Sequence, residues 1–255
     1  MTDTASPGHV ASMAKAAQKK SSPRRRGRSR KPSLWAKVRL WLLRGALGVG
    51  AVVLALVCVF AVIRPPTTPY ILAEGPRHGE IERSWVPMEE IAPVMARSVV
   101  AAEDANYCLH WGFDMGAIRE ALEEGANRGA STISQQTVKN VFLWQGRSWP
   151  RKALESLLTP VVELVWSKRR ILEVYLNVAE FDQGVFGVEA AARHYFGVSA
   201  RDLTATQAAR LAAILPDPKG RSAKAPSDFV RRRAAQIVDG AATIRADGRA
   251  DCFER

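Results

Sequence analysis

The sequence has few cysteines and almost no acidic residues near its N-terminus. Three cysteines in 255 residues are too few for a scaffold built on disulfides. With only 18 glycines and 14 prolines the chain is not collagen-like, and with 47% hydrophobic residues it is not wholly disordered. The length suits one domain of ordinary size with an additional segment, and it allows a sizeable core.

The net charge of +12 comes almost entirely from one end of the chain. Residues 1–44 contain 12 lysines or arginines and a single acidic residue, Asp3. Of the 37 basic and 25 acidic residues in the whole chain, 25 basic and 24 acidic residues are therefore left for positions 45–255. A basic protein invites a nucleic-acid interpretation. Because the remainder is close to neutral, we predict no nucleic-acid partner.

An uncharged apolar run lies between Arg44 and Arg64. As a helix, residues 45–63 would span roughly 28 Å, close to the ~30 Å hydrocarbon core of a bilayer. The excess of Lys and Arg on the N-terminal side predicts that this side is cytoplasmic and that the rest of the chain lies outside the cytoplasm. A cleaved signal peptide is the alternative. The long basic leader, the length of the run and the lack of a clear small-x-small cleavage site argue against it.

The segments beside this anchor have biased composition. Residues 1–44 include SSPRRRGRSRKPS and are predicted to form a basic disordered tail. Residues 64–79 begin with RPPTTP and are interpreted as a stiff linker, with a short strand or two within 70–85. Cys58 lies in the anchor. Cys108 and Cys252 lie on the oxidising side and could pair, but the sequence leaves their pairing open.

Beyond Val86 the pattern of apolar residues is helical. Thr132 and Gln135 have the spacing of a capping box, so a helix is expected to begin at Ser131 or Thr132. Ser148 with Pro150 predicts the start of another helix, which continues to about Phe181 with a kink at Pro160. The other predicted helices cover residues 89–109, 114–127, 185–196, 204–215 and 227–244.

Three groups of polar residues could carry chemistry, and the first lies in residues 101–114. Glu103, Tyr107 and His110 are spaced i, i+4, i+7, which predicts one helical face beside Asp104. A carboxylate on an apolar helix is placed to be partly buried, which suits a general base. The alternative is a salt bridge at a helix end, with a packed tyrosine and a hydrogen-bonded histidine.

The second and third groups combine cations with amides. Gln136, Lys139 and Asn140 are expected on one face, near a helix start whose free N–H groups favour an anion. A solvated polar face is the alternative. Arg151 and Lys152 occupy the first turn of the next helix, where cations oppose the helix dipole. Either an anionic ligand or an i,i+4 ion pair between Arg151 and Glu155 would account for them.

The motifs of this region follow one another in a specific order: EDANYCLHWGFD, GASTISQQTVKNVFL, RKALE, KRRILEVYLN and GVFGVEAAARHYFG. In this order they resemble the motifs of peptidoglycan glycosyltransferases, which occur in class A penicillin-binding proteins and as monofunctional enzymes. The resemblance covers residues 80–220. The remaining residues 221–255 are predicted to form a C-terminal helix and tail, which leaves no room for a transpeptidase domain, so we expect a monofunctional enzyme.

The resemblance implies a mainly α fold, with a lysozyme-like helical lobe and a small membrane-proximal lobe after one transmembrane helix. It implies polymerisation of lipid II onto a growing glycan strand, with inversion at the anomeric carbon and release of undecaprenyl pyrophosphate. By motif, Glu103 corresponds to the catalytic base and Glu155 to a second catalytic carboxylate, the candidate ligand of a divalent cation (Mg²⁺ or Mn²⁺). The implied substrate-binding residues are Asp104, His110, Gln136, Lys139, Asn140, Arg151 and Lys152.

Several positions depart from the family pattern. Tyr107 stands where Phe is usual, Ser134 stands where Thr is usual, and residues 180–187 are a variant of E-x-G-x-G-x-x-G. We interpret Tyr175, Asn177 and Glu189 as structural. Residues 168–170 (Lys-Arg-Arg) are predicted to form a solvated or lipid-facing patch, in which Lys168 is the residue expected to touch substrate.

The resemblance also implies a location and partners. These are the bacterial inner membrane, crossed once, with the catalytic domain in the periplasm, and proteins of cell-wall synthesis or division. A lytic transglycosylase is the nearest alternative, but its substrate has no pyrophosphate and would not need the cations. An inactive anchored scaffold is another, which loss of a motif carboxylate would favour. Both carboxylates are present.

Overall fold

The fold is seen in a computed structural model that describes residues 33–125 and 129–255. It divides into two units, residues 1–46 and residues 47–255. Most of the predicted basic tail, residues 1–32, lies outside the described residues, as do residues 126–128, which include the last two positions of the predicted helix 114–127.

Helix α1 (Leu34–Phe60) contains most of the predicted membrane anchor. It is 27 residues long and contains an 18-residue stretch with a mean hydropathy of 2.3, so it is long and apolar enough to cross a membrane by length and composition. Its N-terminus was predicted too late, because residues 34–44 are helical rather than disordered. The side chain of Ser33 accepts a hydrogen bond from the backbone N–H of Ala36 and so satisfies one free donor of the first turn.

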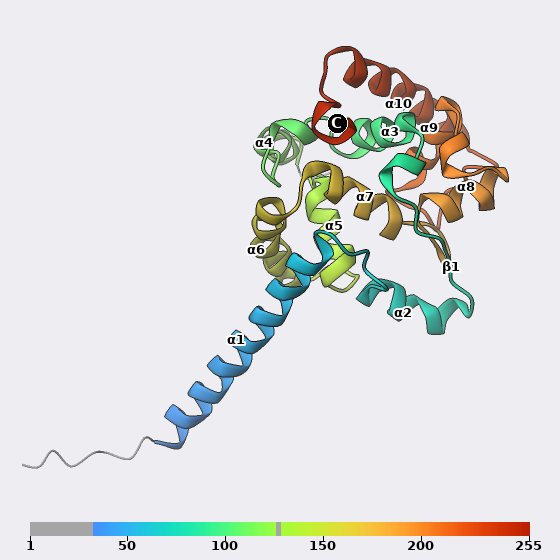
Figure 1. Ribbon diagram of the computed structural model, residues 1–255. Coiled ribbons are helices and arrows are strands. Elements are labelled where there is room, and N and C mark those ends of the chain that lie inside the picture. The colour runs from blue at the N-terminus through green and yellow to red at the C-terminus, as the bar shows by residue number, and fades with distance from the viewer. Residues whose placement is uncertain (1–32, 126–128) are drawn as a thin grey trace, which may run out of the picture. The chain divides into compact units, whose positions relative to one another are not determined.

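The unit formed by residues 47–255 is mostly helical, as predicted (Figure 1). Short 3-10 helices cover Met88–Glu90, Tyr107–Leu109 and Ala200–Asp202. The α-helices are α2 (Pro69–His78), α3 (Pro93–Glu103), α4 (Met115–Glu123), α5 (Ile133–Phe142), α6 (Trp149–Val165), α7 (Lys168–Val178), α8 (Val188–Phe196), α9 (Ala205–Ile214), α10 (Asp228–Ala246) and α11 (Asp251–Glu254).

A small sheet joins the start of this unit to the segment after α7. Strands β1 (Glu82–Arg83), β2 (Glu180–Asp182) and β3 (Val185–Phe186) lie in the order β1-β3-β2, with β1 parallel and β2 antiparallel to β3. Gly187 ends the sheet with φ +88°, and a Cβ there would lie 3.0 Å from the carbonyl oxygen of Asn177. Only glycine fits this close approach. The segment predicted as a linker contains α2, in which Ile71 and Glu74 are buried.

Two groups of helices position the site. Helix α3 packs against α9 and α10, and α5 packs against α6 and α7 (Figure 1). The apolar stripes of these helices meet in the core, where Val99 of α3 and Leu211 of α9 are fully buried. The C-terminal end of α3 and the N-terminal end of α5 approach each other through Asp104, whose carboxylate accepts a hydrogen bond from the backbone N–H of Ile133.

The helix predicted over residues 89–109 is interrupted. Helix α3 ends at Glu103, and Asp104 leaves the helix with φ −162° and ψ 68°. Aspartate side chains compete with helical hydrogen bonds when other backbone donors are near, and here the donor is Ile133. The prediction that Glu103, Tyr107 and His110 share one helical face is therefore wrong.

The long helix predicted from residue 148 to 181 is also two helices. Helix α6 ends at Val165, and the side chain of Ser167 caps α7 by accepting a hydrogen bond from the N–H of Arg170. Pro160 lies inside α6. The capping box of Thr132 and Gln135 is present as predicted.

Candidate active site

Glu103, the last residue of α3, is half-buried and held by α5. The side-chain amide of Gln136 donates a hydrogen bond of 2.8 Å to Glu103 Oε2. The Tyr175 hydroxyl of α7 donates in turn to the Gln136 carbonyl oxygen, at 3.2 Å. Tyr175 thus orients the amide so that its N–H groups face the carboxylate.

The surroundings of Glu103 raise its pKa above the ordinary value of a glutamate, chiefly because burial disfavours the charged form. The hydrogen bond from Gln136 and the positive charges of Arg233 and Lys139 act in the opposite direction. The neighbouring charge of Asp104 adds to the rise. A carboxylate with a raised pKa is a stronger base, which suits abstraction of a proton from a hydroxyl group.

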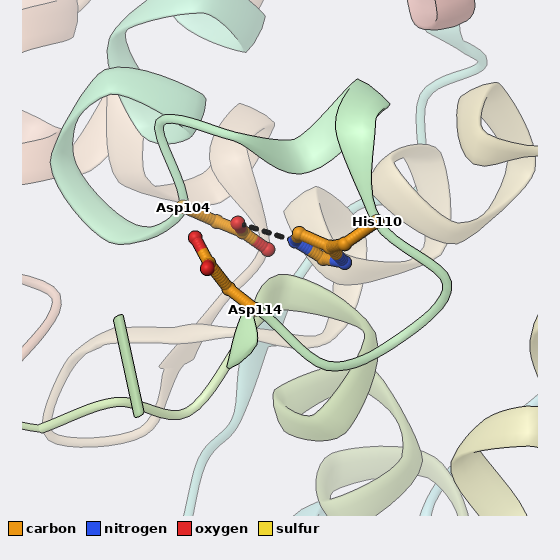
Figure 2. A group of neighbouring side chains, drawn as sticks. All are labelled: Asp104, His110 and Asp114. Carbon is orange, nitrogen blue, oxygen red and sulfur yellow. Dashed lines mark hydrogen bonds and ion pairs between the residues drawn. The ribbon is translucent and has the colours of Figure 1, made fainter. Parts of the chain in front are cut away.

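Asp104, which follows α3, contacts both His110 and the first turn of α5. One of its oxygens lies 2.8 Å from Nε2 of His110 (Figure 2), and the other accepts the 3.0 Å hydrogen bond from Ile133 N–H. The N-terminus of a helix stabilises a carboxylate in this position. The structure therefore brings Asp104 and His110 together, although not on the helical face that was predicted, in a contact that holds the backbone after Glu103.

Glu155 of α6 lies in a contrasting environment. Its buried carboxylate accepts hydrogen bonds from Arg151, at 2.6 Å, and from Lys152. Arg151 also donates to the carbonyl oxygen of Gly146, and Lys152 donates to the hydroxyl of Ser131 at 3.1 Å. The i,i+4 ion pair considered for Arg151 is thus present, and Lys152 adds an i,i+3 ion pair with the same carboxylate.

Lys139 of α5 lies near both carboxylates. Burial lowers its pKa, and the charge of Arg151 acts in the same direction, whereas the charge of Glu155 raises it. Within the described parts of the chain, its ammonium group has no carboxylate within 4.0 Å. Lys139, Arg151 and Lys152 outnumber Glu155, so this cation cluster keeps a net positive charge that an anionic group can neutralise.

Asn140 takes a different place from the other α5 residues of its motif. It is buried, and its side-chain oxygen accepts a hydrogen bond of 3.1 Å from the amide of Gln145. The structure therefore places Gln136 on Glu103, while Asn140 holds the loop that leads into α6.

A cavity of about 490 Å³ opens beside Glu103. Its lining includes Glu103, Asp114, Glu120, Ser131, Gln136 and Arg233. Arg233 comes from α10 and donates a hydrogen bond of 3.1 Å to the carbonyl oxygen of Ala102. Arg233 lies outside the motifs by which the other site residues were predicted. Its position three residues after Val230 and four before Ile237, which are both buried, could have placed it beside the apolar stripe of α10.

The basic patch at residues 168–170, predicted to be solvated or lipid-facing, is only partly exposed. Lys168 lies 2.8 Å from Glu163 and stacks over the ring of Tyr107, at 4.5 Å from its centroid. Arg169 pairs with Glu89 and Arg170 with Glu173, while the Arg170 guanidinium also donates to the carbonyl oxygens of Phe60 and Ile63. All three cations therefore have partners within the fold.

Two residues interpreted as structural have structural contacts. Asn177 is fully buried and exchanges hydrogen bonds with both the N–H and the carbonyl oxygen of Val86. Glu189 accepts hydrogen bonds from Arg193 and from the backbone N–H of Ala200. Tyr175 differs, because its hydroxyl reaches Gln136 and so lies one contact away from Glu103.

The candidate metal ligands do not fit a resident divalent ion. Both oxygens of Glu155 are engaged by cations. Potential ligand atoms of Asp104, His110 and Asp114 lie within 4.8 Å of one another (Figure 2). However, all four carboxylate oxygens of that group already have a partner, which for Asp114 are Asn106 and the N–H of Ala117. A hydrogen-bond network explains these residues without an ion.

The fold and the site combine the two features expected of an enzyme that transfers sugars from an anionic leaving group, a base and a group of cations. A half-buried carboxylate lies in a cleft, and a cation cluster lies within electrostatic reach of it. Residues 72–242 match the Transglycosylase family. The chain belongs to this family, and it is a monofunctional glycosyltransferase of peptidoglycan synthesis.

The matches to its relatives cover most of both chains. The biosynthetic peptidoglycan transglycosylase of Jannaschia sp. (strain CCS1) is 67% identical over 225 residues, which cover 88% of this chain and 94% of the relative. Proteins with the same description from Yersinia pestis (strain Pestoides F) and Yersinia pseudotuberculosis serotype I (strain IP32953) are 49% identical over 210 residues. These cover 78% of this chain and 87% of each relative.

Proposed function

We propose that the protein polymerises lipid II into glycan strands, with inversion at the anomeric carbon and release of undecaprenyl pyrophosphate. The observation that carries this proposal is Lys139, a cation on which the charges of both Glu103 and Glu155 act. A base on one side and cations on the other suit a sugar donor whose leaving group is a pyrophosphate.

In the proposed reaction, Glu103 takes the proton from the sugar 4-hydroxyl of a lipid II bound in the adjoining cavity. The hydroxyl oxygen then forms a bond with the anomeric carbon of the growing chain. The bond from that carbon to the pyrophosphate oxygen breaks, and its electron pair leaves with undecaprenyl pyrophosphate. Attack from the face opposite the leaving group converts an α-linked donor into a β-linked product.

The cation cluster takes the charge that develops on the leaving group. Lys139, Arg151 and Lys152 stabilise the pyrophosphate electrostatically, so little proton donation is needed. Because Arg151 and Lys152 already hold both oxygens of Glu155, the candidate metal ligand, we assign this neutralisation to the side chains of the protein. Gln136 orients the base, whereas Asp104, His110 and Asn140 hold the backbone segments that carry the reacting groups.

We also propose that α1 crosses the bacterial inner membrane once. The 12 basic residues of positions 1–44 favour a cytoplasmic N-terminus, which puts the catalytic domain in the periplasm. Lipid II and undecaprenyl pyrophosphate are held in the same membrane by their hydrocarbon chains. Proteins of cell-wall synthesis or division are the class of partner that this location offers.

The test is polymerisation of purified lipid II by the full-length protein in detergent. We expect long glycan strands, undecaprenyl pyrophosphate and β-linked products, and we expect none of these with Glu103→Gln. The matched control is Glu80→Gln, an exposed glutamate outside the site. If the wild-type protein made no polymer and instead shortened existing strands, the lytic alternative would replace this proposal.

A further inference from the structure

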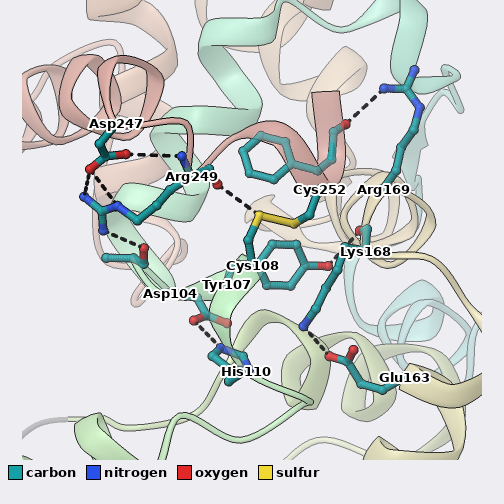
Figure 3. Close-up of a disulfide and its surroundings, with 12 residues drawn as sticks. Asp104, Tyr107, Cys108, His110, Glu163, Lys168, Arg169, Asp247, Arg249 and Cys252 are labelled. Atoms are coloured by element: carbon teal, nitrogen blue, oxygen red, sulfur yellow. Dashed lines mark hydrogen bonds and ion pairs between the residues drawn. A yellow bond between two sulfur atoms is a disulfide. The ribbon is translucent and has the colours of Figure 1, made fainter. Parts of the chain in front are cut away.

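The C-terminal segment, residues 247–255, lies against the loop that follows Glu103 (Figure 3). We call residues 104–110 the catalytic loop. A disulfide between Cys108 and Cys252 joins the two, across 144 residues of sequence. The pairing that the sequence left open is therefore present, and it connects the last residues of the chain with the site.

The contacts between the two segments extend beyond the disulfide. Phe253 is fully buried, with its ring centroid 6.2 Å from that of Tyr107. Arg249 donates a hydrogen bond of 3.0 Å to the carbonyl oxygen of Ala105, and its own carbonyl oxygen lies 2.9 Å from Sγ of Cys108. The C-terminal segment thus contacts the catalytic loop at Ala105, Tyr107 and Cys108.

The C-terminal segment is itself fixed to helices on either side. Glu254 forms an ion pair with Arg97 of α3 at 2.5 Å. Arg169 of α7 donates to the carbonyl oxygen of Phe253 at 3.0 Å. Because α3 and α7 are packed in the core, the segment is a firm support for the loop.

The catalytic loop has little internal support. It contains one short turn of 3-10 helix, and its backbone hydrogen bonds include Tyr107 N–H to Asp104 and Leu109 N–H to Asn106. Yet Asp104, its first residue, fixes the end of α3 relative to the first turn of α5. The 2.8 Å contact of Glu103 with Gln136 depends on that spacing.

We propose that Phe253 and the Cys108–Cys252 disulfide are positioning elements for the reaction: they press the catalytic loop into the conformation in which Asp104 keeps Glu103 aligned with α5. The inference rests on the proposed function, because its effect is on the base. The cation cluster is held by contacts within α5 and α6 and with Ser131, so it does not depend on the C-terminal segment.

This arrangement predicts different effects on kcat and on the KM for lipid II. Loss of the support displaces Glu103 but leaves Lys139, Arg151 and Lys152 in place, so kcat falls while the KM for lipid II stays nearly constant. Displacement of a reacting group by about 1 Å costs on the order of a hundredfold in rate, and we expect a loss of roughly tenfold or more. A merely structural role would lower the unfolding temperature and leave kcat unchanged below it.

The experiment uses the full-length protein in detergent, well below the unfolding temperature of each variant. Cys252→Ala and Phe253→Ala are expected to lose kcat with KM within about twofold of the wild type, and Phe253→Leu to recover most of it because it restores buried volume. Cys58→Ala is the matched control, since Cys58 is a free, exposed cysteine of α1. It should behave as the wild type.

Reduction provides a second measurement on the folded wild-type protein. Dithiothreitol attacks the disulfide by thiol–disulfide exchange, leaving two cysteine thiols and oxidised, cyclic dithiothreitol. We expect it to slow the wild type and Cys58→Ala but not to slow Cys252→Ala further. If Cys252→Ala, Phe253→Ala and the reduced wild type all keep the wild-type kcat, or if only KM rises, the inference is wrong. If the untreated wild type makes no polymer, the proposed function fails instead.

Discussion

Glu103 and Glu155 are the same type of residue in two different environments. Glu103 is half-buried and faces a neutral amide, and burial raises its pKa. Glu155 is more deeply buried and is held by two cations from the preceding turn of its own helix. In the proposed reaction this difference gives the two carboxylates different roles. A carboxylate without a direct ion pair can accept a proton, whereas a doubly paired carboxylate holds cations in place for an anion.

The largest effect that this comparison predicts is on Glu103→Gln. The glutamine keeps the shape of the side chain but cannot accept the proton, so kcat should fall by about 10²–10⁴-fold. The thermal unfolding temperature in detergent should be unchanged or higher, because a buried charge has been removed. A drop in stability equal to that of Glu155→Gln would show that the two carboxylates do not differ as proposed.

Glu155→Gln is predicted to act first on stability. It leaves Arg151, whose side chain is only 10% exposed, without its carboxylate partner. Breaking a buried ion pair costs about 3 kcal/mol, which corresponds to an unfolding temperature lower by roughly 6–12 °C in a chain of this size. Calorimetry of the detergent-solubilised protein measures this shift.

The control for that variant is Asp228→Asn, which breaks the exposed i,i+3 pair with Arg231. Exposed pairs contribute about 1 kcal/mol or less, so its unfolding temperature should change little. Equal shifts for the two variants would contradict the structural role given to Glu155.

Arg233→Gln should displace the pH dependence of the reaction. Glu103 must be ionised to act as a base, so activity rises with pH through its pKa. The groups around it are Gln136 and Lys139 of α5, Arg233 of α10 and the adjacent Asp104. Because the Arg233 charge lowers the pKa of Glu103, its removal raises that pKa further, and the acid limb of log(kcat/KM) moves to higher pH.

The matched control is Arg232→Gln, an exposed arginine one residue earlier in α10. It makes the same change in net charge and should leave the acid limb where it is. If Arg233→Gln raised KM uniformly across the pH range instead, Arg233 would be a substrate contact and not a modulator of the base.

The smallest effect is expected for Tyr175→Phe. This change removes the hydroxyl that donates to Gln136 and leaves the buried ring in place. A typical hydrogen bond contributes about 0.5–1.5 kcal/mol, so kcat should fall by about two- to tenfold. Steady-state kinetics with lipid II measures this, and an effect as large as that of Glu103→Gln would mean that Tyr175 takes part in the chemistry itself.

Much of the fold and of the candidate site could be predicted from the sequence. The apolar run, the capping box of Thr132 and the helical pattern are local, so their signals lie within a few residues of each other. The errors arose where a distant group competed with a local pattern. Helix α3 ends at Glu103 because the backbone N–H of Ile133 donates a hydrogen bond to Asp104. Lys168 is mostly buried because it pairs with Glu163 and lies over the ring of Tyr107.

The sequence by itself determined the family, the two carboxylates and the position of the charge, since residue types and their spacing along the chain specify these. Only the tertiary structure decided which groups surround the base. Arg233 reaches the carbonyl oxygen of Ala102 across 131 residues, and Cys252 reaches Cys108 across 144. No periodicity connects positions so far apart, because core packing alone brings the last helices of the chain to the end of α3.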